Sequence, residues 1–305
     1  MKSWIVLVLL VSGSVLVQAQ STEKKVIITG VRFAYPLVEQ WIAEYKKENP
    51  DVAVQIEPRS TTDPSKYDLL IEAYEPDGTL KDTREFVNVA RYALLPVANA
   101  QSAFSKIYGE KGLTQPLIRQ LYFNDITSNK KDREEIKVPY TVYTRLQKAG
   151  APVTFAHYFG FEQANIVGKA IAGADEHLIK ALLKDTTGIS YSVPGLLFDL
   201  KSRQTLAGLT VLPVDTDNDG KVEKEEKVIG NLDELLTQYE AGIPKNVPVE
   251  SIHLSIAKNS QNAEALRFLK WVLAHDQAIL HTHGFLKPEP QRFQRDKQKF
   301  DVAAN

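Results

Sequence analysis

Hydrophobic and polar positions follow two different periods in the first part of the chain. Residues 25–29 form a β-branched run and residues 52–56 alternate, which predicts two strands, and residues 67–71 predict a third. Between the first two strands, apolar residues recur at helical spacing from Pro36 until Asn49. This β-α-β order predicts a parallel sheet whose strands are joined by crossover helices.

Two longer apolar stretches, residues 86–98 and residues 247–257, predict strands that cross the body of the protein. The pattern also predicts helices at residues 113–121, 162–184, 232–239 and 263–274, and strands at residues 137–144, 188–193 and 206–214. The helical pattern at residues 162–184 is broken near Gly173. The order predicts an α/β protein of two lobes joined by two crossover strands. Lobe I is expected from residues 23–95 and 250–305, and lobe II from residues 96–249. The cleft between two such lobes is a common place for a ligand.

The first residues have the pattern of a secretory signal. Lys2 precedes an apolar run at residues 5–11, and small or apolar residues lead up to Ala19. The run is interrupted at residues 12–14 and is shorter than the roughly 20 residues that a membrane span needs. We therefore predict a signal peptide at residues 1–19, cleaved after Ala19, and a mature protein in the periplasm.

Composition narrows the classes of function. The chain has 305 residues, 43% of them hydrophobic and 25% charged, which is typical of a globular protein of about two domains and excludes wholesale disorder. A formal net charge of −1 predicts no nucleic-acid partner. The absence of cysteine excludes disulfides, cysteine nucleophiles and thiolate metal sites. The common hydrolase, zinc-peptidase and nucleotide-binding motifs are missing from the sequence, so we do not expect an enzyme.

Arginine side chains occur in three turns that follow predicted strands. The candidate ligand-binding residues in these turns are Arg32, Phe33, Arg59, Ser60, Arg145 and Gly150. Open α/β sheets bind ligands at the carboxyl ends of their strands. Helix N-termini offer unpaired N–H groups and a partial positive charge, and arginine adds a fixed charge. The pattern predicts a small-anion site, with Arg145 and Arg32 as main donors and N–H groups around Phe33 and Gly150 as support.

Several segments resemble the phosphate-binding proteins of ABC transporters. Residues 28–58 contain a strand, a glycine turn, Phe33, a proline and a helix with a lysine-rich end, in the order found at the start of that family. Residues 144–155, 188–192 and 268–290 are similar to the family's arginine turn, a middle strand and its closing helix. The resemblance implies a type II periplasmic binding-protein fold, an oxyanion between the lobes, a monomer, and an ABC-transporter permease as partner.

The same segments depart from the family's pattern. Arg32 stands where the family has a threonine, and Ala149 and Ala151 replace hydroxyl-bearing residues that would touch phosphate. No equivalent of the family's cleft aspartate is found after residues 67–70. Extra arginine without that carboxylate favours a more fully ionised or larger anion than phosphate.

Residues 215–226 match the calcium-loop template D-x-D-x-D-G-x-x-x-x-x-E. The ligands that the template indicates are Asp215, Asp217, Asp219, the Lys221 carbonyl and Glu226. Carboxylates this close repel one another unless a cation neutralises them. The flanks are not a pair of helices, so we predict a structural Ca²⁺ site rather than a sensor. A solvated acidic hairpin is the alternative.

Three functions remain open. The first is a periplasmic solute-binding protein that captures phosphate or a related anion for ABC-type transport or sensing. The second is a secreted calcium-binding structural or adhesin-like protein with a vestigial cleft. The third is a secreted hydrolase with an unfamiliar site. Ligand-dependent closure would favour the first function, calcium-dependent stability without an anion response the second, and ester turnover the third.

Overall fold

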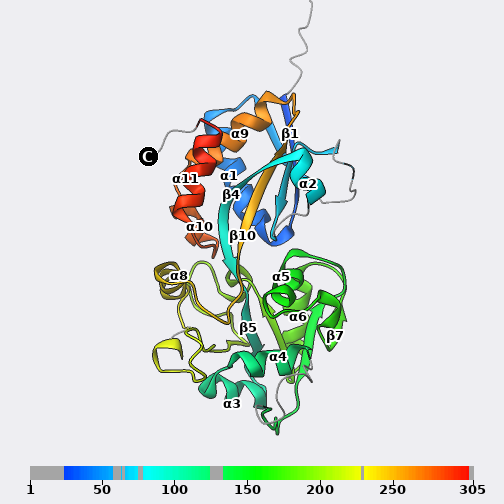
Figure 1. Cartoon of the computed structure of the whole chain (residues 1–305), viewed down its shortest axis with the longest axis vertical. Coiled ribbons are helices and arrows are strands. Elements are labelled where there is room, and N and C mark those ends of the chain that lie inside the picture. Colours follow the sequence, from blue (N-terminus) through cyan, green and yellow to red (C-terminus); the bar gives the residue numbers. More distant parts are fainter. Residues whose placement is uncertain are drawn as a thin grey trace, which may run out of the picture.

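The computed structural model describes residues 24–57, 63, 66–74, 78–123, 133–227 and 230–301. Within these residues the strands form two five-stranded sheets, one in each of two lobes, which Figure 1 shows one above the other. This architecture confirms the predicted two-lobed α/β fold with two crossovers. The predicted signal peptide at residues 1–19 and the candidate residues Arg59 and Ser60 lie outside the described residues.

The sheet of lobe I has the strand order β2-β1-β3-β10-β4. Its strands are β1 (Lys24–Gly30), β2 (Val52–Ile56), β3 (Leu69–Glu72), β4 (Arg84–Ala93) and β10 (Val249–Ala257). β1 pairs in parallel with β2 and β3, whereas β10 pairs antiparallel with β3 and β4. The helical segments of this lobe are η1 (Arg32–Ala34), α1 (Tyr35–Glu48), α2 (Gly78–Thr83), α9 (Ala263–Ala274), α10 (Ala278–Thr282) and α11 (Pro290–Lys299).

Helix α1 is fixed to lobe I by one apolar face. Leu37, Trp41 and Tyr45 recur at helical spacing on this face and are buried. The ring of Tyr45 packs edge-on against Phe268 of α9, with ring centroids 5.1 Å apart. Burial of each large apolar side chain contributes about 1.5–3 kcal/mol. This packing holds the start of α1, and with it the turn that follows β1, in one position.

The sheet of lobe II has the strand order β7-β6-β8-β5-β9. Its strands are β5 (Leu95–Asn99), β6 (Thr141–Arg145), β7 (Lys169–Ile171), β8 (Gly188–Ser192) and β9 (Leu209–Val211). Its helical segments are α3 (Ala103–Lys111), α4 (Gln115–Phe123), α5 (Gly150–Tyr158), η4 (Gln163–Asn165), α6 (Asp175–Lys184), α7 (Pro194–Leu197), η5 (Glu225–Lys227) and α8 (Leu232–Ala241). Among the described helices of both lobes, none has the length and apolar character needed to cross a membrane.

Two crossovers join the lobes. The first passes from β4 to β5 through Leu94, so the single strand predicted at residues 86–98 is two strands that belong to different sheets. The second runs from the end of α8 to β10. The two crossovers lie side by side, because the N–H of Leu94 donates to the carbonyl of Pro248 at 2.9 Å. The two segments that connect the lobes therefore lie next to each other.

The helix predicted at residues 162–184 is wrong in its first half. That half contains η4 and β7, and only α6 is a regular helix. Gly168 and Gly173 flank β7 with φ values of +104° and +105°, which a continuous helix does not allow. A Cβ on Gly168 would lie 2.2 Å from the carbonyl oxygen of Val142, so glycine is required for β7 to pair with β6.

Candidate functional site

A cavity of about 390 Å³ lies between the lobes. Four turns form its walls, and they follow the carboxyl ends of strands β1, β3, β6 and β7, each of which has a parallel neighbour. The lining residues are Gly30, Val31, Arg32, Glu72, Tyr74, Arg145, Gln147, Lys148, Ala149, Gly150, Gly173 and Asp175. The structure thus brings together three of the predicted site residues, Arg32, Arg145 and Gly150.

The turn after β1 is held tightly against the end of β3. The N–H of Val31 donates to the carbonyl of Ile71 at 3.1 Å, and a Cβ on Gly30 would lie 2.1 Å from that same oxygen. Gly30 has a φ of +139°, so glycine is required for the close approach. Arg32 follows as an exposed residue at the cleft, where its guanidinium can reach an anion.

Phe33 lies outside the cavity wall, and its side chain belongs to the core. Its ring contacts Tyr92 at a centroid distance of 5.0 Å and stacks on Phe285 at 6.3 Å. The Phe33 ring therefore packs in the core, and the sequence prediction for this position concerned backbone N–H groups. What Phe33 can offer a ligand is the backbone N–H of a helical first turn, which has no partner within its own helix.

Arg145 ends β6 and is paired within the cleft. Its Nη1 lies 2.8 Å from Oδ1 of Asp175 at the start of α6, and both side chains are 10% exposed. Burial raises the pKa of Asp175, and the Arg145 guanidinium lowers it in part. Nε of Arg145 is buried and has no hydrogen-bond partner in the described part of the chain. An anion would meet a guanidinium whose charge is partly balanced and whose donors are not all used.

Gly150 begins α5 and brings the lobes into direct contact. A Cβ at this position would lie 2.7 Å from the Cβ of Ala73 in lobe I. Next to this point, the hydroxyl groups of Tyr92 and Thr154 lie 2.8 Å apart, and Thr154 donates to the carbonyl of Ala73 at 3.2 Å. The first turn of α5, with its free N–H groups, therefore faces the end of β3 across the cleft.

Glu72 is a cleft residue that the sequence analysis missed. It is the last residue of β3, it is 4% exposed, and it lines the cavity. The sequence offered no equivalent of the family's cleft aspartate after residues 67–70, but the structure places the carboxylate of Glu72 at the cleft. The lining contains two carboxylates, Glu72 and Asp175, and three cationic side chains, Arg32, Arg145 and Lys148. The lining therefore has an excess of one positive charge. A buried carboxylate accepts hydrogen bonds, so it favours an anion that still carries a proton.

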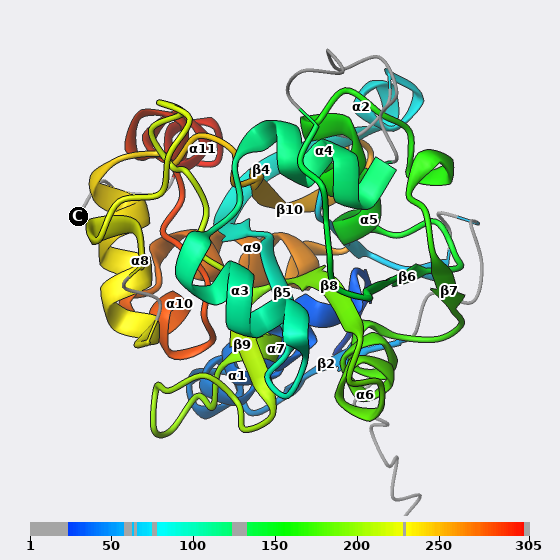
Figure 2. The same ribbon diagram turned by 90° about the horizontal axis from the view of Figure 1, so that it is seen from below.

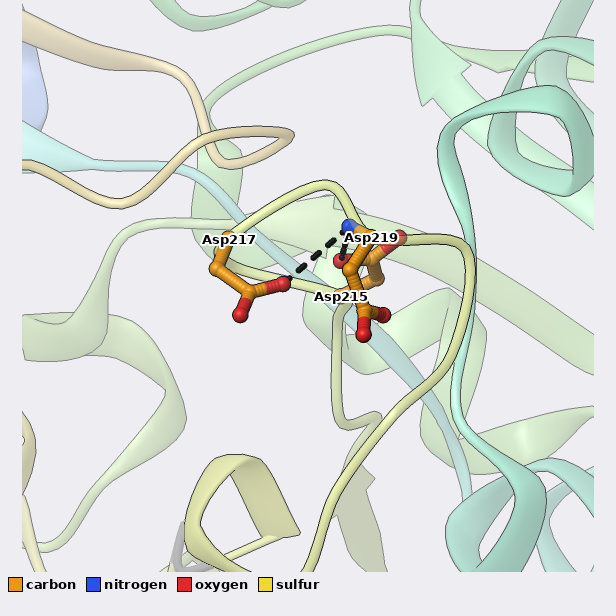
Figure 3. Close-up of side chains that lie close together, drawn as sticks. All are labelled: Asp215, Asp217 and Asp219. Atoms are coloured by element: carbon orange, nitrogen blue, oxygen red, sulfur yellow. Dashed lines mark hydrogen bonds between the residues drawn. The ribbon is translucent and has the colours of Figure 1, made fainter.

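The predicted calcium loop places its carboxylates around one turn (Figure 3). One carboxylate oxygen from each of Asp215, Asp217 and Asp219 lies within 4.8 Å of the others, and the same holds for Asp217, Glu223 and Glu226. Asp217 belongs to both groups, so the two groups share one residue. Lys221 is exposed, and its N–H donates to Oδ1 of Asp219 at 2.9 Å.

Asp215 anchors this loop from inside. Its side chain is buried, and its Oδ2 accepts from the N–H of Gly220 at 2.9 Å. Burial raises the pKa of Asp215, although hydrogen bonds from backbone N–H groups lower it in part. Asn246, just before β10, donates to the carbonyl of Asp215 at 2.8 Å. The loop is therefore attached to the segment that forms the second crossover.

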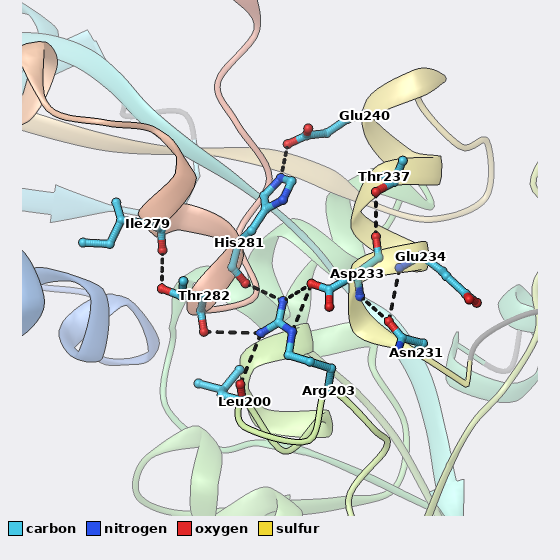
Figure 4. A network of polar contacts seen from close by, with 10 residues as sticks. All are labelled: Leu200, Arg203, Asn231, Asp233, Glu234, Thr237, Glu240, Ile279, His281 and Thr282. Carbon is cyan, nitrogen blue, oxygen red and sulfur yellow. Dashed lines mark hydrogen bonds and ion pairs between the residues drawn. The ribbon is translucent and has the colours of Figure 1, made fainter.

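A second polar contact joins the lobes at α8 and α10 (Figure 4). Arg203 of lobe II donates to the carbonyl of His281 at 2.7 Å and pairs with Asp233 at 2.6 Å. Nε2 of His281 lies 2.8 Å from Oε1 of Glu240 at the end of α8. Figure 1 and Figure 2 both place α8 and α10 on the opposite side of the crossover strands from α5. The two inter-lobe contacts therefore flank the crossovers.

The α8–α10 contact is expected to weaken in acid. Burial raises the pKa of Glu240, but hydrogen bonds from the N–H of Lys287 and from His281 outweigh it, so the net shift is downward. A carboxyl with a lowered folded pKa stabilises the protein above its unfolded pKa, and this contribution is lost as the pH falls through the folded value. The melting temperature of Glu240→Gln should therefore fall less than that of wild type when the pH is lowered from neutral to acidic. Thermal melts across a pH series check this, with exposed Glu234→Gln as control, and parallel curves for Glu240→Gln and wild type would contradict it.

Comparison with known proteins supports the fold. No family model and no curated protein matches the sequence. Among solved structures, a putative phosphate ABC transporter substrate-binding protein with bound phosphate from Clostridium perfringens has a TM-score of 0.64 at 16% identity, over 87% of this chain and 100% of that chain. An ABC-type phosphate transport receptor from Vibrio cholerae has a TM-score of 0.59 at 12% identity, over 86% and 100%. The CcmR regulatory domain of Synechocystis in complex with 2-PG has a TM-score of 0.52 at 13% identity, over 81% and 95%. The chain thus has the two-lobed fold of periplasmic binding proteins, which regulatory domains share.

Proposed function

We propose that the protein is an exported, periplasmic solute-binding protein that captures a small oxyanion, phosphate or a related anion, in the inter-lobe cleft. The observation that carries this proposal is the convergence of Arg32, Arg145 and Gly150 on one cavity from both lobes. The fold of the phosphate-binding neighbours supports it. The captured anion would serve ABC-type transport or sensing, with a permease as partner in the first case. The protein would act as a monomer and would catalyse no reaction.

Ligand capture would work by closure of the lobes. Arg32 belongs to lobe I and Arg145 to lobe II, so an anion contacts both only when the lobes are together. A ligand that makes these contacts in the closed state alone shifts the population toward that state. Calorimetry with phosphate, sulfate and a phosphonate, combined with small-angle scattering, tests the proposal. Binding without compaction would contradict the closure, and no binding of any anion would contradict the function.

Glu72 is expected to select for an anion that carries a proton. Phosphate keeps a proton near neutral pH and can donate it to this carboxylate, whereas sulfate has none. Glu72→Gln replaces the acceptor by an amide that can also donate, so the preference for phosphate over sulfate should fall by about tenfold or more. Calorimetry with the two anions measures the ratio. Exposed Glu39→Gln on α1 is the matched control, and an unchanged ratio in Glu72→Gln would contradict the assignment.

We also propose that residues 215–226 hold a structural Ca²⁺ ion. Support comes from the match to the loop template and from the convergence of carboxylate oxygens from Asp215, Asp217 and Asp219. Glu226 would join this set through the group that it forms with Asp217 and Glu223. If the protein responds to calcium and to no anion, the secreted calcium-binding structural protein becomes the better description.

A further inference from the structure

Lobe I contains a second cavity that shares no lining residue with the inter-lobe cleft. Its volume is about 350 Å³, and it lies between the end of α9, the segment before α11, and α11 itself. Figure 1 shows α9, α10 and α11 together on one side of this lobe. The wall residues used below are Leu273, Asp276, Lys287, Pro288, Phe293 and Lys297. The proposed function assigns no role to this cavity.

The cavity contains the side chain of a buried lysine. Lys297 is 4% exposed, and its Nζ lies over the ring of Phe293, 5.7 Å from the ring centroid. Within the described residues, no carboxylate pairs with this ammonium group and no hydrogen bond is formed by it. The Nζ of Lys297 is not one of the fully buried polar atoms that lack a partner, so it is still reached from the cavity. A lysine that is this buried is normally paired, and an aromatic face is a weaker partner than a carboxylate.

The other ionisable groups in the wall do not supply the missing partner. Oδ1 of Asp276 accepts from the N–H of Ala278 at 2.9 Å, and Nε2 of His275 pairs with Glu44 at 2.7 Å. Lys287 is exposed at the cavity and adds a second positive charge. The cavity wall therefore contains two lysines and one aspartate, an excess of one positive charge over these three side chains, together with the apolar side chains of Leu273, Pro288 and Phe293.

We infer that this cavity is a second ligand site, for a small organic carboxylate. The carboxylate would pair with Lys297 and be approached by Lys287, and an apolar body would pack on Phe293 and Pro288. An inorganic oxyanion would leave the apolar wall unused, so the inferred ligand class differs from that of the inter-lobe cleft. Binding here would be independent of Arg145, which lies in the other lobe.

Fluorine NMR with para-fluorobenzoate as the probe tests the inference on the full-length mature protein. We expect saturable binding in the millimolar range to wild type, weakened by about tenfold or more in Lys297→Met, since a charge-assisted contact is lost. Lys299→Met on the same helix, which removes an exposed lysine paired with Glu85, is the matched control and should bind as wild type does. Saturating phosphate and Arg145→Ala should leave probe binding unchanged, so the outcome is independent of the proposed function.

A second measurement distinguishes a ligand site from a structural lysine. If the ammonium group lacks a protein partner, Lys297→Met should melt at the same or a higher temperature than wild type without ligand, because an unpaired buried charge is removed. A clearly lower melting temperature would mean that the protein itself satisfies Lys297, and would overturn the inference. Absence of probe binding to wild type, or equal binding to wild type and Lys297→Met, would also overturn it.

Discussion

Replacement of Arg145 by alanine is expected to weaken anion binding by about ten- to a hundredfold, because a charge-assisted hydrogen bond is worth roughly 1.5–3 kcal/mol. Arg145 is largely buried in the cleft and retains an unpaired Nε donor, so solvent screens its contact with an anion only weakly. Calorimetry with phosphate measures the effect. An affinity equal to that of wild type would show that Arg145 does not contribute to anion binding.

A matched pair of variants separates binding from stability. Arg145→Ala also leaves Asp175 without its partner, so the melting temperature should fall together with the affinity. Addition of Asp175→Asn removes the stranded carboxylate and should restore most of the melting temperature while the affinity stays low. Recovery of the affinity in the double variant would mean that Asp175 repels the anion in the single variant and that Arg145 contributes little to binding.

Chelation of calcium is expected to lower the melting temperature by several degrees. A ligand that binds only the folded state stabilises it by about 2.7 kcal/mol when its concentration is a hundredfold above Kd, and that amount shifts the melting temperature of a protein of this size by several degrees. Extracellular calcium modules often work at roughly 10⁻⁴–10⁻³ M, so the comparison is made at millimolar calcium. Differential scanning calorimetry with and without chelator measures the shift.

Two substitutions test whether the loop is the source of that shift. Asp215→Asn and Glu226→Gln should each abolish the calcium dependence, whereas Asp82→Asn, an exposed residue of α2, should retain it. Anion binding should stay close to wild type in the loop variants. An unmoved melting curve on chelation would make the loop a solvated hairpin. Loss of anion binding would show that the contact between Asp215 and Asn246 couples the loop to lobe closure.

The strongly patterned elements could be predicted from the sequence. The predicted helix at residues 263–274 and the predicted strand at residues 52–56 have the same bounds as α9 and β2, because each carries a regular apolar face that packs on its own lobe. Arg32 and Arg145 could be assigned to one site because each follows a strand and the carboxyl ends of these strands face the same cleft.

The elements that were missed depend on tertiary contacts. β7 is a three-residue edge strand whose pairing with β6 is set by the flanking glycines, and such a short run has no period of its own. Asp175 lies far from Arg145 in the sequence, and the two meet because β6 and β7 run in parallel register. Glu72 lies one residue beyond the predicted strand at residues 67–71, and only the fold shows that this strand end opens into the cleft.

The hydrogen bond between Leu94 and Pro248 has a mechanical consequence. Two crossover segments that are hydrogen-bonded to each other favour rotation of the lobes about one axis through these segments. A ligand that fits poorly would not change the path of that rotation and would stop it at a different angle. The closing angle would then report the size of the captured ion, and a receptor that recognises both lobe surfaces could distinguish a correct cargo from a wrong one without touching it.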